Sequence, residues 1–219
     1  MNGKRFKRAG SLVILVILLT PFADAAMYSG GTGTENAPYQ IVNGADWTTL
    51  TATSDDWDKY FILVENIDFD GRSLTPVGNT VTAFTGIFDG NGYRLSNGQI
   101  NLPAGENVGL FGLVGSGGEV RNLDVETFYV VGDISVGGLA GRNNGMIMSC
   151  YASCTVKGRG SIGGLVGFVD SEGVVSSCCA SCAVWAGIIA GGLVGENQHG
   201  IVENCYATGP VSTLSLIHI

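Results

Sequence analysis

The sequence has few charged residues and almost no histidine. Charged residues make up 14% of the 219 residues, only two residues are His, and acidic residues outnumber basic ones by 19 to 11. Binding of nucleic acid or of anionic lipid requires a basic surface. The shortage of lysine and arginine therefore argues against both classes of partner, and we predict no nucleic-acid ligand.

Hydrolytic and cofactor-binding motifs are also missing. The sequence contains neither H-E-x-x-H nor G-x-S-x-G, which are typical of zinc peptidases and serine hydrolases. Gly158–Gly163 fits the pattern G-x-G-x-x-G, but a dinucleotide site needs a helix after it, and here the last glycine belongs to a repeated strand. The cysteines lack the paired C-x-x-C spacing of zinc sites. We therefore predict no catalytic, cofactor-binding or metal-binding residues.

The chain has no apolar run of comfortable membrane-spanning length. Leu12–Leu19 is wholly apolar but short, whereas a membrane-spanning helix needs about 20 residues. It follows a basic patch and precedes Ala23-Asp24-Ala25, the small-x-small pattern of a cleavage site. We predict a signal peptide over residues 1–25, with an uncleaved anchor as the alternative. The mature chain then has a net charge of −11, no membrane span and a secreted or cell-surface location.

Glycine, by contrast, is abundant, with 35 residues, and much of it belongs to a repeated block. The block occurs at Val136–Gly141, Ile162–Gly167 and Ala190–Gly195, with a looser copy at Val108–Gly112. One leucine occupies the same position in each copy, and successive leucines are 29, 26 and 28 residues apart: Leu110, Leu139, Leu165 and Leu193. A period in this range predicts a stack of structural repeats.

A second repeated block follows each copy of the first. Its opening cysteine recurs at Cys150, Cys178 and Cys205. Between the two blocks lies a polar turn whose last residue is always glycine, where we expect a positive φ: Gly118, Gly145, Gly173 and Gly200. Apolar residues separated by an odd number of positions face opposite sides of a strand, so we also expect corners at Asn204 and at Gly137-Gly138.

Short strands, fixed corners and coils of 26 to 29 residues predict an all-β fold, a parallel β-helix. Each coil would lie about 4.8 Å above the last, so that equivalent side chains form rows. Asp46–Asp58 is the one predicted helix, capped by Asp46 and closing the N-terminal end.

We predict five regions in chain order. The signal peptide is followed by a leader and cap over 26–85, then by the solenoid over 86–213, with repeats at 108–134, 135–160, 161–188 and 189–213. Residues 214–219 break the repeat and are interpreted as a non-native tail from a truncated reading frame.

Six cysteines in an exported protein allow two interpretations. Disulfides are normal in that environment. The regular spacing favours buried rows of thiols instead, because stacked side chains with parallel Cβ vectors suit disulfide geometry poorly and free cysteine packs as a small hydrophobe. Cys179 occupies the position of Tyr151 and Tyr206 in the other copies, so we expect it to face outward.

The blocks Gly191–Gly195 and Asn204–Gly209 resemble the GLUG-motif repeats of bacterial secreted and surface proteins. The segment Tyr60–Leu102 looks like the lead-in found before such repeats. The resemblance implies a right-handed β-solenoid outside the cell. Members of this family include adhesin-like proteins and stalks of surface peptidases.

We therefore predict a non-enzymatic exported repeat module, part of a longer protein, for cell-surface adhesion or structural display. Its expected partners are surface glycans or other extracellular proteins, with Tyr151, Tyr206 and Trp185 as the aromatic candidates for a binding face. The alternatives are a stalk of a larger surface enzyme and a carbohydrate-active β-helix enzyme, a polysaccharide lyase or hydrolase. Such an enzyme would need a groove with clustered carboxylates and an arginine or lysine.

Overall fold

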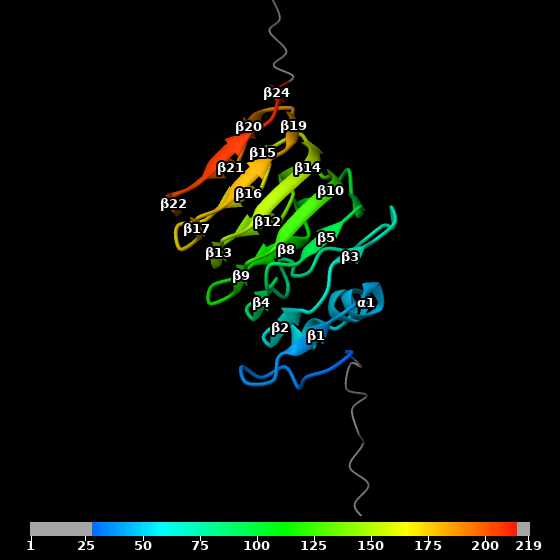
Figure 1. Ribbon diagram of the computed structural model, residues 1–219. Coiled ribbons are helices and arrows are strands. Elements are labelled where there is room, and N and C mark those ends of the chain that lie inside the picture. The colour runs from blue at the N-terminus through cyan, green and yellow to red at the C-terminus, as the bar shows by residue number, and fades with distance from the viewer. Residues whose placement is uncertain (1–27, 214–219) are drawn as a thin grey trace, which may run out of the picture.

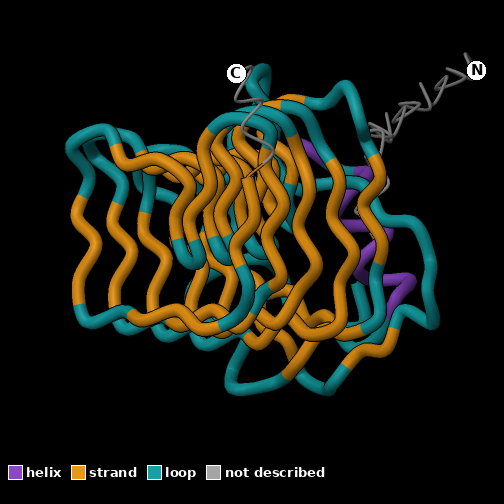
Figure 2. Tube along the Cα trace, turned by 90° about the horizontal axis from the view of Figure 1, so that it is seen from above, coloured by secondary structure: helices purple, strands orange, loops and turns teal. Residues whose placement is uncertain are grey.

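The computed structural model describes residues 28–213, and the chain winds through them as a column of about six coils. Figure 1 shows the coils stacked from the blue N-terminal end to the red C-terminal end, and Figure 2 shows the strands running side by side across the column. The predicted signal peptide and the predicted tail at 214–219 lie outside the described residues.

Four sheets run along the column, and every pairing between their strands is parallel. Sheet I has seven strands: β1 (Tyr39–Ile41), β2 (Tyr60–Leu63), β4 (Ile87–Asp89), β9 (Glu119–Arg121), β13 (Met146–Met148), β17 (Val174–Ser176) and β22 (Ile201–Glu203). Sheet II has nine: β3 (Ile67–Asp68), β5 (Arg94–Ser96), β6 (Gln99–Asn101), β10 (Asp124–Val131), β14 (Tyr151–Gly158), β18 (Cys179–Ser181), β19 (Ala183–Ala186), β23 (Tyr206–Thr208) and β24 (Val211–Thr213).

The two remaining sheets have four strands each. Sheet III contains β7 (Glu106–Val108), β11 (Ile134–Gly137), β15 (Ser161–Gly163) and β20 (Ile189–Gly191). Sheet IV contains β8 (Phe111–Val114), β12 (Ala140–Asn143), β16 (Val166–Val169) and β21 (Val194–Asn197). The chain visits the sheets in the same order in each repeat, so the fold is the predicted all-β parallel β-helix.

The repeated leucines lie above one another at the corner between sheets III and IV. Leu110, Leu139 and Leu165 are fully buried, and Leu193 is partly buried against the same core. The backbone N–H of Leu139 donates to the carbonyl of Leu165, and that of Leu165 donates to the carbonyl of Leu193, each at 2.9 Å. Residues nearly thirty positions apart in the sequence are therefore direct neighbours along the column.

The corner between sheets I and II is formed by one residue in each coil. Asn122, Ser149, Ser177 and Asn204 have φ values of 53°, 52°, 55° and 54°. This left-handed conformation turns the chain, so that Val202 and Cys205 need not point to opposite sides of one strand. The corner predicted at Asn204 is confirmed.

The prediction of a positive φ at the last glycine of each turn is wrong. Gly118, Gly145, Gly173 and Gly200 are not among the positive-φ glycines. Glycine is required there for space, because a Cβ on Gly145 would collide with the carbonyl oxygens of Gly115 and Gly118 in the preceding coil. Close approach between coils, and not backbone conformation, accounts for this row.

Sheets III and IV lie against each other with almost no side chain between them. A Cβ on Gly163, at the end of β15, would lie 2.6 Å from the backbone N of Gly195 in β21. A Cβ on Gly195 would in turn lie 2.6 Å from the backbone N of Ile162. The glycines of the repeated block therefore bring the two backbones together, and the chain bends at the glycine pair so that both Val136 and Leu139 are buried.

The N-terminal cap contains α1 (Gly44–Ala52) and a single 3₁₀ turn (Ser54–Asp56). The observed helix begins two residues earlier and ends six residues earlier than the predicted Asp46–Asp58, and the predicted N-cap at Asp46 is wrong. Asn43 is the N-cap, its Oδ1 accepting hydrogen bonds from two backbone N–H groups of the first turn. Asp46 is buried and accepts hydrogen bonds from Ser29 and from the backbone N–H of Val42. These bonds join the segment before the helix to the first turn of α1.

Trp47 fills the interior of the first coils from α1. Its ring centroid lies 6.0, 5.7 and 6.3 Å from those of Phe69, Phe88 and Phe111, each at a steep angle. Edge-to-face aromatic contacts of this kind stabilise a core beyond the area that they bury. The helix thus closes the N-terminal end of the hydrophobic column, beside β1 and β2 in Figure 1.

The stack begins before the predicted boundary at residue 86. β1 pairs with β2, and β2 pairs with β4, in the same sheet as the recognisable repeats. The leader and cap predicted over 26–85 therefore contribute strands to the solenoid itself. At the other end of the described column, Val202 and Val211 are 38% and 45% exposed, whereas their counterparts Val175 and Val184 are buried beneath them.

The backbone contact between sheets III and IV predicts a large effect of one methyl group. Gly163→Ala should lower the free energy of unfolding by about 1–3 kcal/mol, the usual cost of overpacking, because neither backbone can move aside. Gly44→Ala is the control: its Cβ would lie 3.9 Å from Phe69 in ordinary contact, and it should stabilise by about 0.4–1 kcal/mol. Chemical denaturation of both variants measures this, and equal stabilities would contradict the contact.

Candidate functional site

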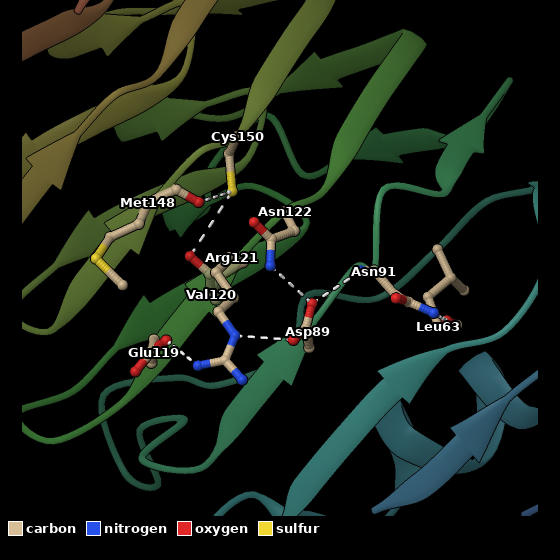
Figure 3. Close-up of polar contacts among 9 residues, drawn as sticks. All are labelled: Leu63, Asp89, Asn91, Glu119, Val120, Arg121, Asn122, Met148 and Cys150. Atoms are coloured by element: carbon tan, nitrogen blue, oxygen red, sulfur yellow. Dashed lines mark hydrogen bonds and ion pairs between the residues drawn. The ribbon is translucent and has the colours of Figure 1, made fainter. Parts of the chain in front are cut away.

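A cluster of charged side chains lies on the outer side of sheet I, where β4 and β9 end. The parallel register places Asp89 beside Arg121. Nε of Arg121 donates to Oδ2 of Asp89 at 2.8 Å, and its Nη1 donates to Oε1 of Glu119 at 2.6 Å (Figure 3). This is the kind of arrangement, two carboxylates around an arginine, that a carbohydrate-active enzyme would need.

The hydrogen bonds of Asp89 make it a poor acid or base. Besides Arg121, its carboxylate accepts from the side-chain amide of Asn122 at 3.0 Å and from the backbone N–H of Asn91 at 2.8 Å. Partial burial by itself raises the pKa of Asp89, but the hydrogen bonds from Asn122 and Arg121 outweigh it and hold the pKa below its usual 3.8. A general acid or base works best with a pKa near the operating pH.

The hollow beside this cluster has a volume of about 230 Å³ and is lined by Glu35, Tyr60, Asp89 and Arg121 among others. Asp89 and Arg121, its charged groups from the two strands, are already paired with each other. The arrangement is therefore suited to joining two successive coils.

Arginine–carboxylate pairs join successive coils at four places: Arg94–Glu126, Arg121–Asp89, Arg142–Asp170 and Arg159–Asp133. Two of them are bidentate, with N–O distances of 2.6 and 2.7 Å for Arg142 and 2.8 Å twice for Arg159. Each side chain is partly exposed, so that one pair contributes about 0–1 kcal/mol. None of these pairs is among the predicted features, although each joins residues one coil apart, 26 to 32 positions along the chain.

The cysteines of the second repeated block stack in two rows. The backbone N of Cys150 lies 3.4 Å from Sγ of Cys178, and that of Cys178 lies 3.3 Å from Sγ of Cys205. In the second row, the backbone N of Cys154 lies 3.1 Å from Sγ of Cys182.

All six cysteines are free thiols, and only Cys179 and Cys205 are not fully buried. Burial raises the pKa of the Cys150 thiol, whose Sγ lies 3.2 Å from the carbonyl oxygen of Met148 (Figure 3). The rows therefore pack as small hydrophobic side chains within the core.

The outer face of sheet II carries the exposed aromatic residues. Cys179 lies in register between Tyr151 and Tyr206, as the alignment of repeats predicts. Beside this row, Nζ of Lys157 lies 5.3 Å from the ring centroid of Tyr129 and 4.8 Å from that of Trp185. Tyr129 is not in the predicted set. Trp185 pairs with Lys157 in the ladder, whereas Tyr129 pairs with Thr155 and lies diagonally across from Lys157.

Two hollows lie on this same face, with volumes of about 390 and 500 Å³. Both are lined by Thr127 and Tyr129, so the two hollows adjoin at these residues, and together we call them the sheet II groove. Within residues 28–213, no group of three His, Cys, Asp or Glu side chains is placed to hold a metal ion. None of the helices formed by these residues is long and apolar enough to cross a membrane.

Residues 186–213, the last coil and the strands leading into it, match the family model of the GLUG motif. The chain is a β-helix protein that carries the GLUG motif. The matched segment holds the third glycine block and the third cysteine block. The same positions recur in the two preceding coils with parallel pairing in register, so the earlier coils are built in the same way.

Two relatives of the GLUG-repeat chain are much longer than it is. Halomucin of Haloquadratum walsbyi is 38% identical over 65% of this chain but over 2% of its own length. A protein of Evansella cellulosilytica, named as a Gly-rich membrane protein, is 34% identical over 57% of this chain and 15% of its own length. The chain thus corresponds to a small part of each relative.

A solved structure from Bacteroides ovatus has the same fold. It is named as an immunoglobulin A1 protease, superposes with a TM-score of 0.64, and is 20% identical over 85% of this chain and 70% of its own. At this identity the likeness shows the architecture of the GLUG-repeat chain alone.

The hydrogen bonds of Asp89 predict a contribution to acid sensitivity. Its pKa is lower in the folded state than 3.8, so the stability that it adds is complete above 3.8 and is lost as the pH falls further. Asp89→Asn should lower the free energy of unfolding by about 1–3 kcal/mol at neutral pH and reduce its decline in acid. Thermal unfolding followed from neutral pH to about pH 3 measures this. Asp55→Asn, at an exposed position, is the control; equal acid sensitivity of the wild type and Asp89→Asn would contradict the assignment.

The thiol rows predict how the cysteines react. In the native protein only Cys179 and Cys205 should react readily with a thiol reagent, because the other four are buried. After unfolding without reductant all six should react. Quantitative labelling followed by peptide mass spectrometry measures both states. Fewer than six reactive thiols in the unfolded chain would show that disulfides, and not thiols, stack along the column.

Proposed function

We propose that this chain is an exported, non-enzymatic module that forms a stiff column at the cell surface, for adhesion or structural display. The observation that carries the proposal is the continuous stack. One core runs from Trp47 in the cap to Ala186, and backbone ladders join each coil to the next. The relative named as a Gly-rich membrane protein supports a place at a cell envelope.

A column of this kind suits a spacer. Each coil contacts its neighbours in the stack, so the length grows by about 4.8 Å per added coil without a change in the rest of the fold. The four arginine–carboxylate pairs hold successive coils in register on the outside. The net charge of −11 expected for the mature chain keeps such a surface soluble.

The second candidate is a carbohydrate-active enzyme, and the hollow beside Asp89 and Arg121 favours it. Against it stands the low pKa of Asp89, whose carboxylate is held by three donors. Release of new reducing ends from neutral or acidic polysaccharides by the purified chain, abolished in Asp89→Asn, would overturn the non-enzymatic part of the proposal.

Export is tested by comparing the full chain with a variant that lacks residues 2–25, both produced in a bacterial host. The full chain should leave the cytoplasm and begin at Ala26 in mass spectra, because cleavage after Ala23-Asp24-Ala25 is expected. The variant should remain inside. A full chain that stays in the cytoplasm with Met1 or Asn2 at its start would contradict the proposal.

A further inference from the structure

The sheet II groove arises where the strands of sheet II are interrupted at equivalent positions in several coils. Asn97, between β5 and β6, and Thr127, within β10, both have a φ of 57°. The register between β10 and β14 shifts at Thr127, and Gly209-Pro210 separates β23 from β24. Because these irregularities stack, the outer face is depressed along the axis of the column.

The groove crosses the coils and does not end within one of them. One of its hollows begins at Asp70 and the other reaches Pro210, and they meet at Thr127 and Tyr129. Asp70 follows β3 and Pro210 precedes β24, so the groove spans five steps of about 4.8 Å, or roughly 24 Å. Its shape fits an extended polymer that lies along the column.

The walls repeat the same chemistry from coil to coil. Hydroxyl or amide side chains line the groove at Gln99, Thr127, Ser153, Thr155 and Ser181. These groups can both donate and accept hydrogen bonds. Backbone N–H and C=O groups of sheet II are already used in its parallel ladders, so the face cannot take an extended peptide as an added strand.

Aromatic rings flank the groove beside one cation. Tyr129, which lines both hollows, is 38% exposed, and Trp185 is 40% exposed, with Lys157 between them. Such rings offer a flat apolar face to the C–H groups of a sugar ring, while their edges stay hydrated. Asp70 is the one carboxylate that lines the two hollows, so the groove itself carries little charge.

From these features we infer that the sheet II groove binds a neutral, extended glycan chain along the column axis. An extended chain laid along this axis would meet the hydroxyl side chains of successive coils, which lie about 4.8 Å apart. The chain as a whole has a net charge of −8, which disfavours a polyanionic glycan. The inference rests on the proposed function only for the presence of the groove outside the cell.

Affinity electrophoresis tests the binding. The full chain is run in native gels that contain hydroxyethyl cellulose, polygalacturonate or no polymer, and its retardation gives the affinity. The neutral polymer should retard the wild type, and polygalacturonate should not. Trp185→Ala should bind roughly tenfold more weakly, the factor that corresponds to about 1.4 kcal/mol of lost contact. Thr155→Glu, which places a larger charged side chain inside the groove, should abolish retardation.

Phe168→Ala is the matched control. Phe168, on β16 of sheet IV, also packs against a cation, with Cζ of Arg142 5.1 Å from its ring centroid, but it lies outside the groove. This variant should be retarded like the wild type. Thermal unfolding of all three variants shows whether each is folded. If Thr155→Glu does not fold, the retardation of Trp185→Ala alone tests the binding.

Three results would overturn the inference: no retardation of the wild type by the neutral polymer, equal retardation of the wild type and Trp185→Ala, or displacement of the glycan by an extended Ser- and Thr-rich peptide. The last would assign the groove to a protein partner. Each leaves the proposed export unaffected, because that is measured separately by the location and the N-terminus of the chain.

Discussion

The direct contact between the backbones of sheets III and IV is the constraint on which the fold depends. Gly163 and Gly195 face each other across it with no room for a Cβ. Since the two sheets cannot be separated by side chains there, the chain must bend sharply at the glycine pair of each coil, and the leucine after that pair turns into the core.

Stacking in register explains features that look unrelated in the sequence. A parallel ladder places each residue beside the residue one coil away. Arg121 therefore meets Asp89, thiol meets thiol, and Lys157 lies beside Trp185. A surface made in this way presents one chemistry at regular intervals along an axis. It is better suited to a spacer or to a repeating ligand than to a single reaction centre, which needs different groups converging on one point.

The parts that could be predicted are those in which the sequence repeats itself. Leu139, Leu165 and Leu193 can be aligned by eye, and their alignment predicts both the stack and the burial of the row. The first coils have no recognisable copy of the motif, so the membership of β1 and β2 in sheet I could not be predicted. The sequence predicts Asp46 as the cap because both Asp and Asn suit that position, and only the fold shows that Asp46 accepts hydrogen bonds from Ser29.

The period, the all-β class and the rows of equivalent side chains can be read from the amino-acid sequence, because a repeat is visible without knowledge of the fold. The reason for the turn glycines and the presence of the sheet II groove become visible only in the folded chain. Both depend on which atoms lie across from a residue: the carbonyls of Gly115 and Gly118 opposite Gly145, and the stacked interruptions at Asn97 and Thr127. Distances between coils are set by the whole stack, and no single segment of the chain encodes them.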